Sequence, residues 1–60
     1  MKIIIVEDEY HIRMGLSNYI KSIGEPYKVI GEAEDGQEGM LLIKKLYPDL
    51  VITDIRMPRL

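Results

Sequence analysis

Three acidic side chains near the two ends of the chain carry the most informative chemistry. Glu7 and Asp8 directly follow a run of β-branched residues, and Asp54 directly follows a second largely apolar run. If both runs are neighbouring parallel strands, their carboxyl ends meet at one edge of a sheet and the carboxylates converge. Two like charges about 4 Å apart repel by roughly 4 kcal/mol at an effective dielectric of about 20, so such a group needs a neutralising cation. Carboxylate oxygens without His or Cys nearby favour a hard ion such as Mg²⁺.

Each of these acids also has a simpler interpretation. Asp54 alone would be a polar residue that ends a strand. Glu7 and Asp8 alone would place favourable negative charge at a helix N-terminus. The metal site becomes the better interpretation when all three acids are taken together. His11, with no second ligand close to it in the sequence, is expected to be a solvated helix residue.

The two apolar runs are expected to be buried strands. Residues 3–6 are contiguous and β-branched, which favours a strand. Residues 50–52 lack polar alternation, as in a strand that is covered on both faces. Strands of this kind belong to parallel α/β sheets, in which ligands bind just beyond the carboxyl ends.

From Tyr10 onward the apolar period changes to that of an amphipathic helix. Gly24 is expected to end this helix, and Pro26 prevents its continuation. Met14 lies off the apolar stripe and is expected to be exposed or to contact a partner. The stripe itself consists of Ile12, Leu16, Tyr19, Ile20 and Ile23.

The middle of the chain predicts a second strand and a second helix. Residues 27–33 are less apolar than the first strand, as is typical of an edge strand. Asp35 is the expected N-cap of the next helix, with Glu38 three residues later. This helix is expected to run to about Leu46, with Leu41 pointing away from its apolar stripe. The stripe comprises Gly39, Ile43 and Leu46, flanked by Met40 and Leu42.

The predicted order is therefore β-α-β-α-β in one domain over residues 1–60, with parallel strands and right-handed crossovers. A chain of 60 residues buries only about 60% of its unfolded surface, and the absence of Cys excludes disulfides. Independent stability is therefore expected to be marginal. The net charge is −2 with both signs well mixed, which predicts no nucleic-acid surface. The first apolar run is too short for a signal peptide, and no segment suits a membrane, so a cytoplasmic protein is expected.

Three motifs together resemble the receiver domain of bacterial two-component response regulators. They are Ile-Val-Glu-Asp-Glu at 5–9, Gly-Glu-Ala-Glu-Asp-Gly at 31–36 and Pro-Asp-Leu-Val-Ile-Thr-Asp-Ile-Arg-Met-Pro at 48–58. They cover the whole chain in the expected order, and the last motif is highly specific. The resemblance implies a flavodoxin-like parallel sheet with strand order 2-1-3-4-5.

The resemblance also implies a role for each matching residue. Asp54 corresponds to the aspartate that accepts a phosphoryl group. Asp8 corresponds to a direct Mg²⁺ ligand, and Glu7 to an acid that holds the ion through water. The backbone carbonyl of Arg56 corresponds to a further ligand. These roles agree with a carboxylate nucleophile attacking phosphorus while Mg²⁺ offsets the developing charge.

The implied partner is a sensor histidine kinase that supplies the phosphoryl group, and the chain is expected to be a signalling domain and not an enzyme. Complete receivers also carry a switch Ser/Thr and a Lys at the ends of their fourth and fifth strands. Thr53 is too early to match the first, and Lys44 and Lys45 lie in the second helix. The chain is thus expected to be the amino-terminal half of a receiver, truncated to β-α-β-α-β. The segment 7–16 is similar to receivers joined to AraC-type DNA-binding domains, so DNA contact is expected only through an output domain.

Three other functions compete with this one. Haloacid dehalogenase-like phosphatases use Asp-x-Asp, but position 56 is Arg. A nucleotide-binding domain would need a glycine-rich turn where residues 7–9 are all acidic. A non-signalling piece that acts only as an assembly building block stays open as the alternative. In either case the open edge of residues 50–53 is expected to give a homodimer, by strand pairing or by exchange of elements.

Overall fold

The computed structural model describes residues 1–53, and its elements follow the predicted order along the chain. They are β1 (Lys2–Val6), α1 (Tyr10–Ile23), β2 (Lys28–Ala33), α2 (Gly36–Leu46) and β3 (Leu50–Thr53). The strands form one parallel sheet in the order β2-β1-β3, so β1 is central and the first and third strands are neighbours. This arrangement confirms the truncated flavodoxin-like α/β fold, and β2 lies at an edge as expected.

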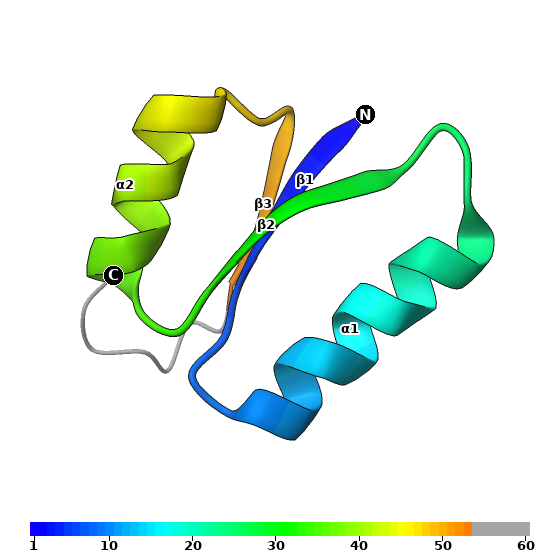
Figure 1. Cartoon of the computed structure of the whole chain (residues 1–60), viewed down its shortest axis with the longest axis horizontal. Helices are drawn as coiled ribbons and strands as arrows, with labels where there is room; N and C mark the ends of the chain where they lie inside the picture. Colours follow the sequence, from blue (N-terminus) through cyan, green and yellow to red (C-terminus); the bar gives the residue numbers. More distant parts are fainter. Residues whose placement is uncertain (54–60) are drawn as a thin grey trace.

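The two helices cover opposite faces of the sheet (Figure 1). Successive side chains of a strand point to opposite faces, so the continuous apolar run of β1 supplies both cores. Ile4 and Val6 belong to the core under α2, together with Ala33. Ile3 and Ile5 belong to the core under α1, together with Ile20. The run at the start of the chain is uninterrupted because both of its faces are buried.

The buried face of α1 differs from the stripe predicted from the sequence. Three members of that stripe are exposed, namely Ile12, Tyr19 and Ile23. The side chains buried against the sheet are Arg13, Ser17 and Ile20. Leu16, another member of the stripe, is half-buried against the core. Met14, which lies off the stripe and was expected to be exposed or to contact a partner, is half-buried. The helix therefore presents a partly polar face to the sheet and leaves an apolar flank in solvent.

A one-residue register shift in β2 explains why α1 buries polar side chains. Ile3 pairs with Val29 and Ile4 pairs with Gly31, so Ile30 is an extra residue between two pairs, as in a β-bulge. Beyond the bulge the alternation is inverted, and Glu32 faces α1 while Ala33 enters the core under α2. Ser17 Oγ donates a hydrogen bond of 3.1 Å to Glu32 Oε2. The polar positions of α1 thus lie above the one carboxylate on its face of β2.

The helix α2 begins at its predicted cap and packs closely on β1. Asp35 is the N-cap, and its Oδ1 accepts a hydrogen bond of 2.9 Å from the backbone N–H of Glu38. Gly39 is buried because the helix backbone approaches Val6 directly. Leu41 is exposed as predicted, whereas Met40, expected beside the buried stripe, is exposed as well. The apolar contacts to the sheet come from Leu42, Ile43 and Leu46.

The amino ends of β1 and β3 are joined by a pair of hydrogen bonds between Lys2 and Asp49. The backbone N–H of Lys2 donates to Asp49 Oδ2 at 2.7 Å, and the N–H of Asp49 donates back to the carbonyl of Lys2 at 2.8 Å. This reciprocal pair sets the point at which β3 joins β1, because the first paired residues, Ile3 and Leu50, come directly after it. Tyr27, predicted to open β2, lies just before the strand and donates its N–H to Gly24 instead.

Candidate functional site

The carboxyl ends of all three strands meet at one edge of the sheet. Val6, the last residue of β1, pairs with Ala33 on one side and with Thr53 on the other, and these are the last residues of β2 and β3. The predicted convergence of the first and third strands is therefore confirmed up to Thr53. Asp54 and Arg56, the expected phosphoacceptor and carbonyl ligand, lie outside the described residues.

Glu7 is the first residue beyond β1 at this edge, and it is held by three hydrogen bonds. Its N–H donates to the carbonyl of Ala33 at 3.0 Å, which extends the sheet by one bond. Its carboxylate Oε2 accepts from the N–H of Glu9 at 2.9 Å, and its carbonyl accepts from Arg13 Nη1 at 2.8 Å. The residue is only 4% exposed. Burial of an acid is tolerated here because the turn supplies a donor.

The other two acids of the turn have different surroundings. Glu9 is the N-cap of α1, and its Oε2 accepts a hydrogen bond of 2.8 Å from the N–H of Ile12. Sequence reasoning missed this role, since it considered favourable charge at the helix start only for Glu7 and Asp8, as the alternative to a metal site. Asp8 is exposed at the carboxyl edge, between a buried acid and a capping acid. Glu9 is exposed as well, but its carboxylate caps the helix, whereas Asp8 does not cap α1.

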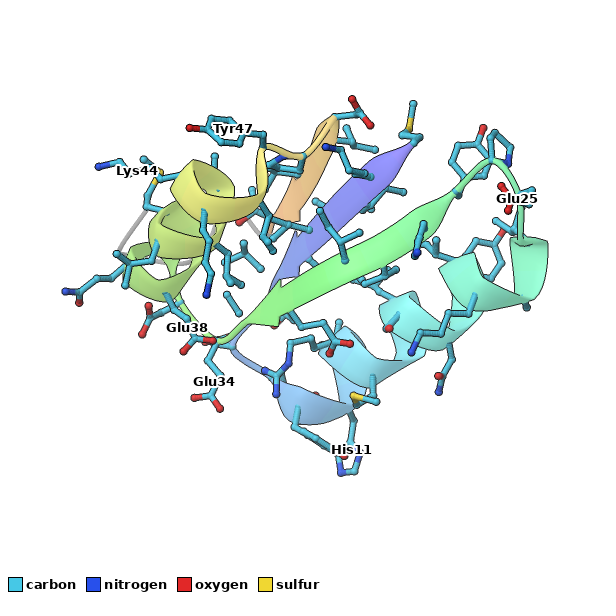
Figure 2. The ribbon with its side chains drawn as sticks, turned by 45° about the horizontal axis from the view of Figure 1, so that its top comes forward. His11, Glu25, Glu34, Glu38, Lys44 and Tyr47 are labelled. Atoms are coloured by element: carbon cyan, nitrogen blue, oxygen red, sulfur yellow. The ribbon has the colours of Figure 1, made fainter. Side chains whose placement is uncertain are left out.

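The carboxylate oxygens of Glu7 and Asp8 are ligands of the kind that a hard cation prefers. Within residues 1–53 no group of three or more His, Cys, Asp or Glu side chains is placed to hold a metal ion. Of the four predicted ligands, Glu7 and Asp8 lie at this edge of the sheet, and Asp54 and Arg56 lie outside the described residues. His11 is exposed and points away from the sheet, as predicted for a solvated helix residue (Figure 2).

A buried polar network behind this turn was not predicted from the sequence. Arg13 is 9% exposed, and its Nε lies 3.8 Å from Glu32 Oε1. Glu32 is fixed in turn by Ser17, and the Arg13 guanidinium lies 5.5 Å from the centre of the Tyr10 ring. The sequence does contain a signal for this network. Arg13 and Ser17 lie four residues apart on one helix, and the following strand has Glu32 as its single acid.

No helix within residues 1–53 is both long and apolar enough to cross a membrane.

The acidic side chains Glu34 and Glu38 also lie near the carboxyl edge, where α2 begins, and both are exposed and directed outward (Figure 2). They therefore belong to the solvated rim of this edge, in contrast to Glu7, which is buried beneath it.

The chain matches known response regulators over almost its whole length. The family model described as "Response regulator receiver domain" matches residues 3–60. The transcriptional regulatory protein PdtaR of Mycobacterium tuberculosis is 47% identical over 58 residues, which is 97% of this chain and 27% of the relative. The transcriptional regulatory protein HptR of Staphylococcus aureus is also 47% identical over 97% of this chain and 23% of the relative. The chain thus spans about a quarter of the length of the curated relatives it matches. With its β2-β1-β3 sheet and acidic turn, the chain belongs to the family of response regulator receiver domains.

Proposed function

We propose that this receiver domain accepts a phosphoryl group on Asp54 from a sensor histidine kinase. A phospho-accepting role in signalling follows from membership of the family. The specific residues are our inference, namely Asp54 as acceptor and Mg²⁺ bound by Glu7, Asp8, Asp54 and the backbone carbonyl of Arg56. In this role the domain is a phosphoacceptor and not an enzyme. As two relatives are named transcriptional regulatory proteins, we infer that an output partner carries any contact with DNA.

The observation that supports this proposal is the pairing of Val6 with Thr53. It ends β1 and β3 at the same edge, one residue before Glu7 and one residue before Asp54 in the sequence. The exposure of Asp8 at this edge is a second support, because a direct metal ligand must be reachable from solvent. The buried Glu7 suits an acid that acts on the ion through an intervening water.

The proposed transfer is a displacement at phosphorus. A carboxylate oxygen of Asp54 forms a bond to the phosphorus atom while the P–N bond of the donor phosphohistidine breaks, and the imidazole leaves. Bound Mg²⁺ would offset the negative charge on the phosphoryl oxygens and on the acidic turn. The contribution of the fold is positioning, because Glu7 is fixed by the sheet, by the turn and by α1.

The direct test is phosphorylation by a small-molecule acyl phosphate in the presence of Mg²⁺, followed by intact mass and by mapping of the modified peptide. We expect Mg²⁺-dependent labelling at Asp54 and none in Asp54→Asn. Asp35→Asn is the matched control, since it makes the same chemical change at a helix cap where Asn is an equivalent residue. Labelling at another position, or undiminished labelling of Asp54→Asn, would contradict the assignment.

A second candidate role is assembly, which one feature of the sheet favours. Within residues 1–53, β3 pairs with β1 alone, so its outer edge pairs with no other strand of this part of the chain. The exposed apolar flank of α1, formed by Ile12, Tyr19 and Ile23, adds surface that a second copy would cover. We therefore propose a homodimer in which third strands pair or elements are exchanged.

A further inference from the structure

The buried Arg13 is the residue that the proposed reaction does not use, although it contacts the acidic turn directly. It lies on the face of α1 that packs against the sheet and is 9% exposed. A charged side chain is costly to bury unless it is paired and hydrogen-bonded. An arginine buried here must therefore make contacts that offset this cost, and its contacts show what it holds in place.

Arg13 is fixed on three sides. Its Nη1 donates to the carbonyl of Glu7 at 2.8 Å, its Nε lies 3.8 Å from Glu32 Oε1, and its guanidinium lies beside the Tyr10 ring. Glu32 is itself held by the hydroxyl of Ser17 at 3.1 Å. The guanidinium is therefore anchored to β2 at one end, and its other end holds the peptide that follows β1.

The atom that Arg13 holds belongs to the peptide unit between Glu7 and Asp8. A peptide unit is planar, so the direction of the Glu7 carbonyl also fixes the direction of the Asp8 N–H and the position of its Cα. The N–H side of Glu7 is already fixed by its bond to Ala33. Arg13 restrains the carbonyl side of the same residue through its hydrogen bond to the Glu7 oxygen. The next residue along the chain is the exposed Asp8.

We propose that Arg13 is a positioning residue for Mg²⁺, which sets the location of Asp8 through the Glu7–Asp8 peptide. This inference rests on the proposed function, in which Asp8 is a direct ligand. Partners that orient metal ligands typically change metal affinity by about 10- to 100-fold when they are removed. Arg13 differs from the usual case because it acts through the main chain and leaves the carboxylate itself free.

The sign of the effect separates positioning from simple electrostatics. Removing a positive charge close to the acidic turn lowers the repulsion that an incoming cation experiences, which by itself would strengthen Mg²⁺ binding. Loss of positioning would weaken it. We expect Arg13→Met to bind Mg²⁺ about tenfold more weakly than the unmodified chain, the lower end of the range for orienting partners. Arg13→Lys, which keeps the charge and one donor, should show a smaller loss.

The experiment is a Mg²⁺ titration followed by the amide resonances of Asp8 and Glu9, with fold monitored by circular dichroism. Ile20→Val is the matched control, because it loosens the same buried face of α1 without touching the network. We expect it to keep its Mg²⁺ affinity. In the metal-free state the Asp8 amide of Arg13→Met should also shift, since the Glu7 carbonyl loses its donor.

The outcomes distinguish this inference from the function on which it rests. If the unmodified chain and Asp8→Ala respond equally to Mg²⁺, the proposed metal site is wrong. If Asp8→Ala loses the response while Arg13→Met binds as tightly as the unmodified chain, or more tightly, the site stands and the role of Arg13 is refuted. An equal loss in Ile20→Val and Arg13→Met would also refute it, because general loosening of α1 would then explain both.

Discussion

Gly39 of α2 lies so close to Val6 of β1 that a Cβ added at position 39 would stand 2.8 Å from Val6 Cγ2 and 3.3 Å from Cγ1. Val6 is 1% exposed and belongs to the core under α2, so it has little room to move away. The glycine is required here by the closeness of helix and strand and not by an unusual backbone angle. Its contact with Val6 sets the distance between α2 and the sheet.

The same substitution should therefore have opposite effects at two helical glycines. Gly39→Ala is expected to lower the free energy of unfolding by about 1–2 kcal/mol, because overpacking outweighs the better helix propensity of Ala. At Gly15, in α1, an added Cβ would meet nothing within 4 Å. Gly15→Ala should raise the free energy of unfolding by about 0.5–1 kcal/mol. Urea unfolding at one protein concentration measures both, and shifts in the same direction would contradict the packing described.

The cap of α2 gives a second test. Asp35→Ala should lower the free energy of unfolding by about 1 kcal/mol, because the N–H of Glu38 loses its acceptor. Asp35→Asn keeps an oxygen in the same place and should change stability by only a few tenths of a kcal/mol. Thermal or urea unfolding decides between them. An Asn variant as unstable as the Ala variant would show that the charge, and not the hydrogen bond, is what matters.

Mg²⁺ should act on one edge of the sheet. On titration with MgCl₂ we expect amide shifts concentrated at residues 7–9, and their loss in Asp8→Asn. Glu25→Gln removes the same amount of charge from an exposed residue in the α1–β2 loop, which lies at the opposite end of β2 (Figure 2). That variant should respond like the unmodified chain. Equal weakening in both variants would mean that Mg²⁺ is attracted by net charge and not by a site.

The association of the chain should be visible on dilution. If third strands pair or elements are exchanged, folding and association are coupled, and the midpoint of unfolding rises with concentration. Light scattering with size exclusion should give a dimer at high concentration and loss of folded signal on dilution. Ile23→Lys places charge on the exposed flank of α1 and should weaken the dimer, whereas Lys21→Gln in the same turn should not. A monomer that stays folded at every concentration would exclude the homodimer.

The sequence predicted the elements well because their signals are local. The apolar run at 3–6, the glycine at 24 and the cap at Asp35 each act within a few residues, and the structure confirms all three. The pairing of the first and third strands was implied by the family resemblance, through its strand order, and the structure confirms it. The acids could be placed at one edge because parallel strands end on the same side of a sheet, although only Glu7 and Asp8 lie within the described residues.

The buried face of α1 could not be predicted, because it depends on what lies beneath the helix. Apolar periodicity selected Ile12, Tyr19 and Ile23, yet the sheet receives Arg13 and Ser17. The reason is Glu32, which needs polar partners and whose orientation is set by an extra residue in another element. The helical period of apolar residues does not depend on the register of the neighbouring strand, and it is this register that places a carboxylate under the helix.

The extra residue at Ile30 has a consequence for how this strand tolerates insertions and deletions. Deleting Ile30 would leave Ile3 paired with Val29 and Ile4 paired with Gly31, so the strand would alternate regularly and Glu32 and Ala33 would keep their present faces. Pairing a retained Ile30 with Ile4 would instead move each later residue to the opposite face, so that Glu32 would face the apolar core under α2. Sequences that align with this segment should therefore accept a one-residue gap at position 30 without a change in the chemical character of the two positions that follow the glycine.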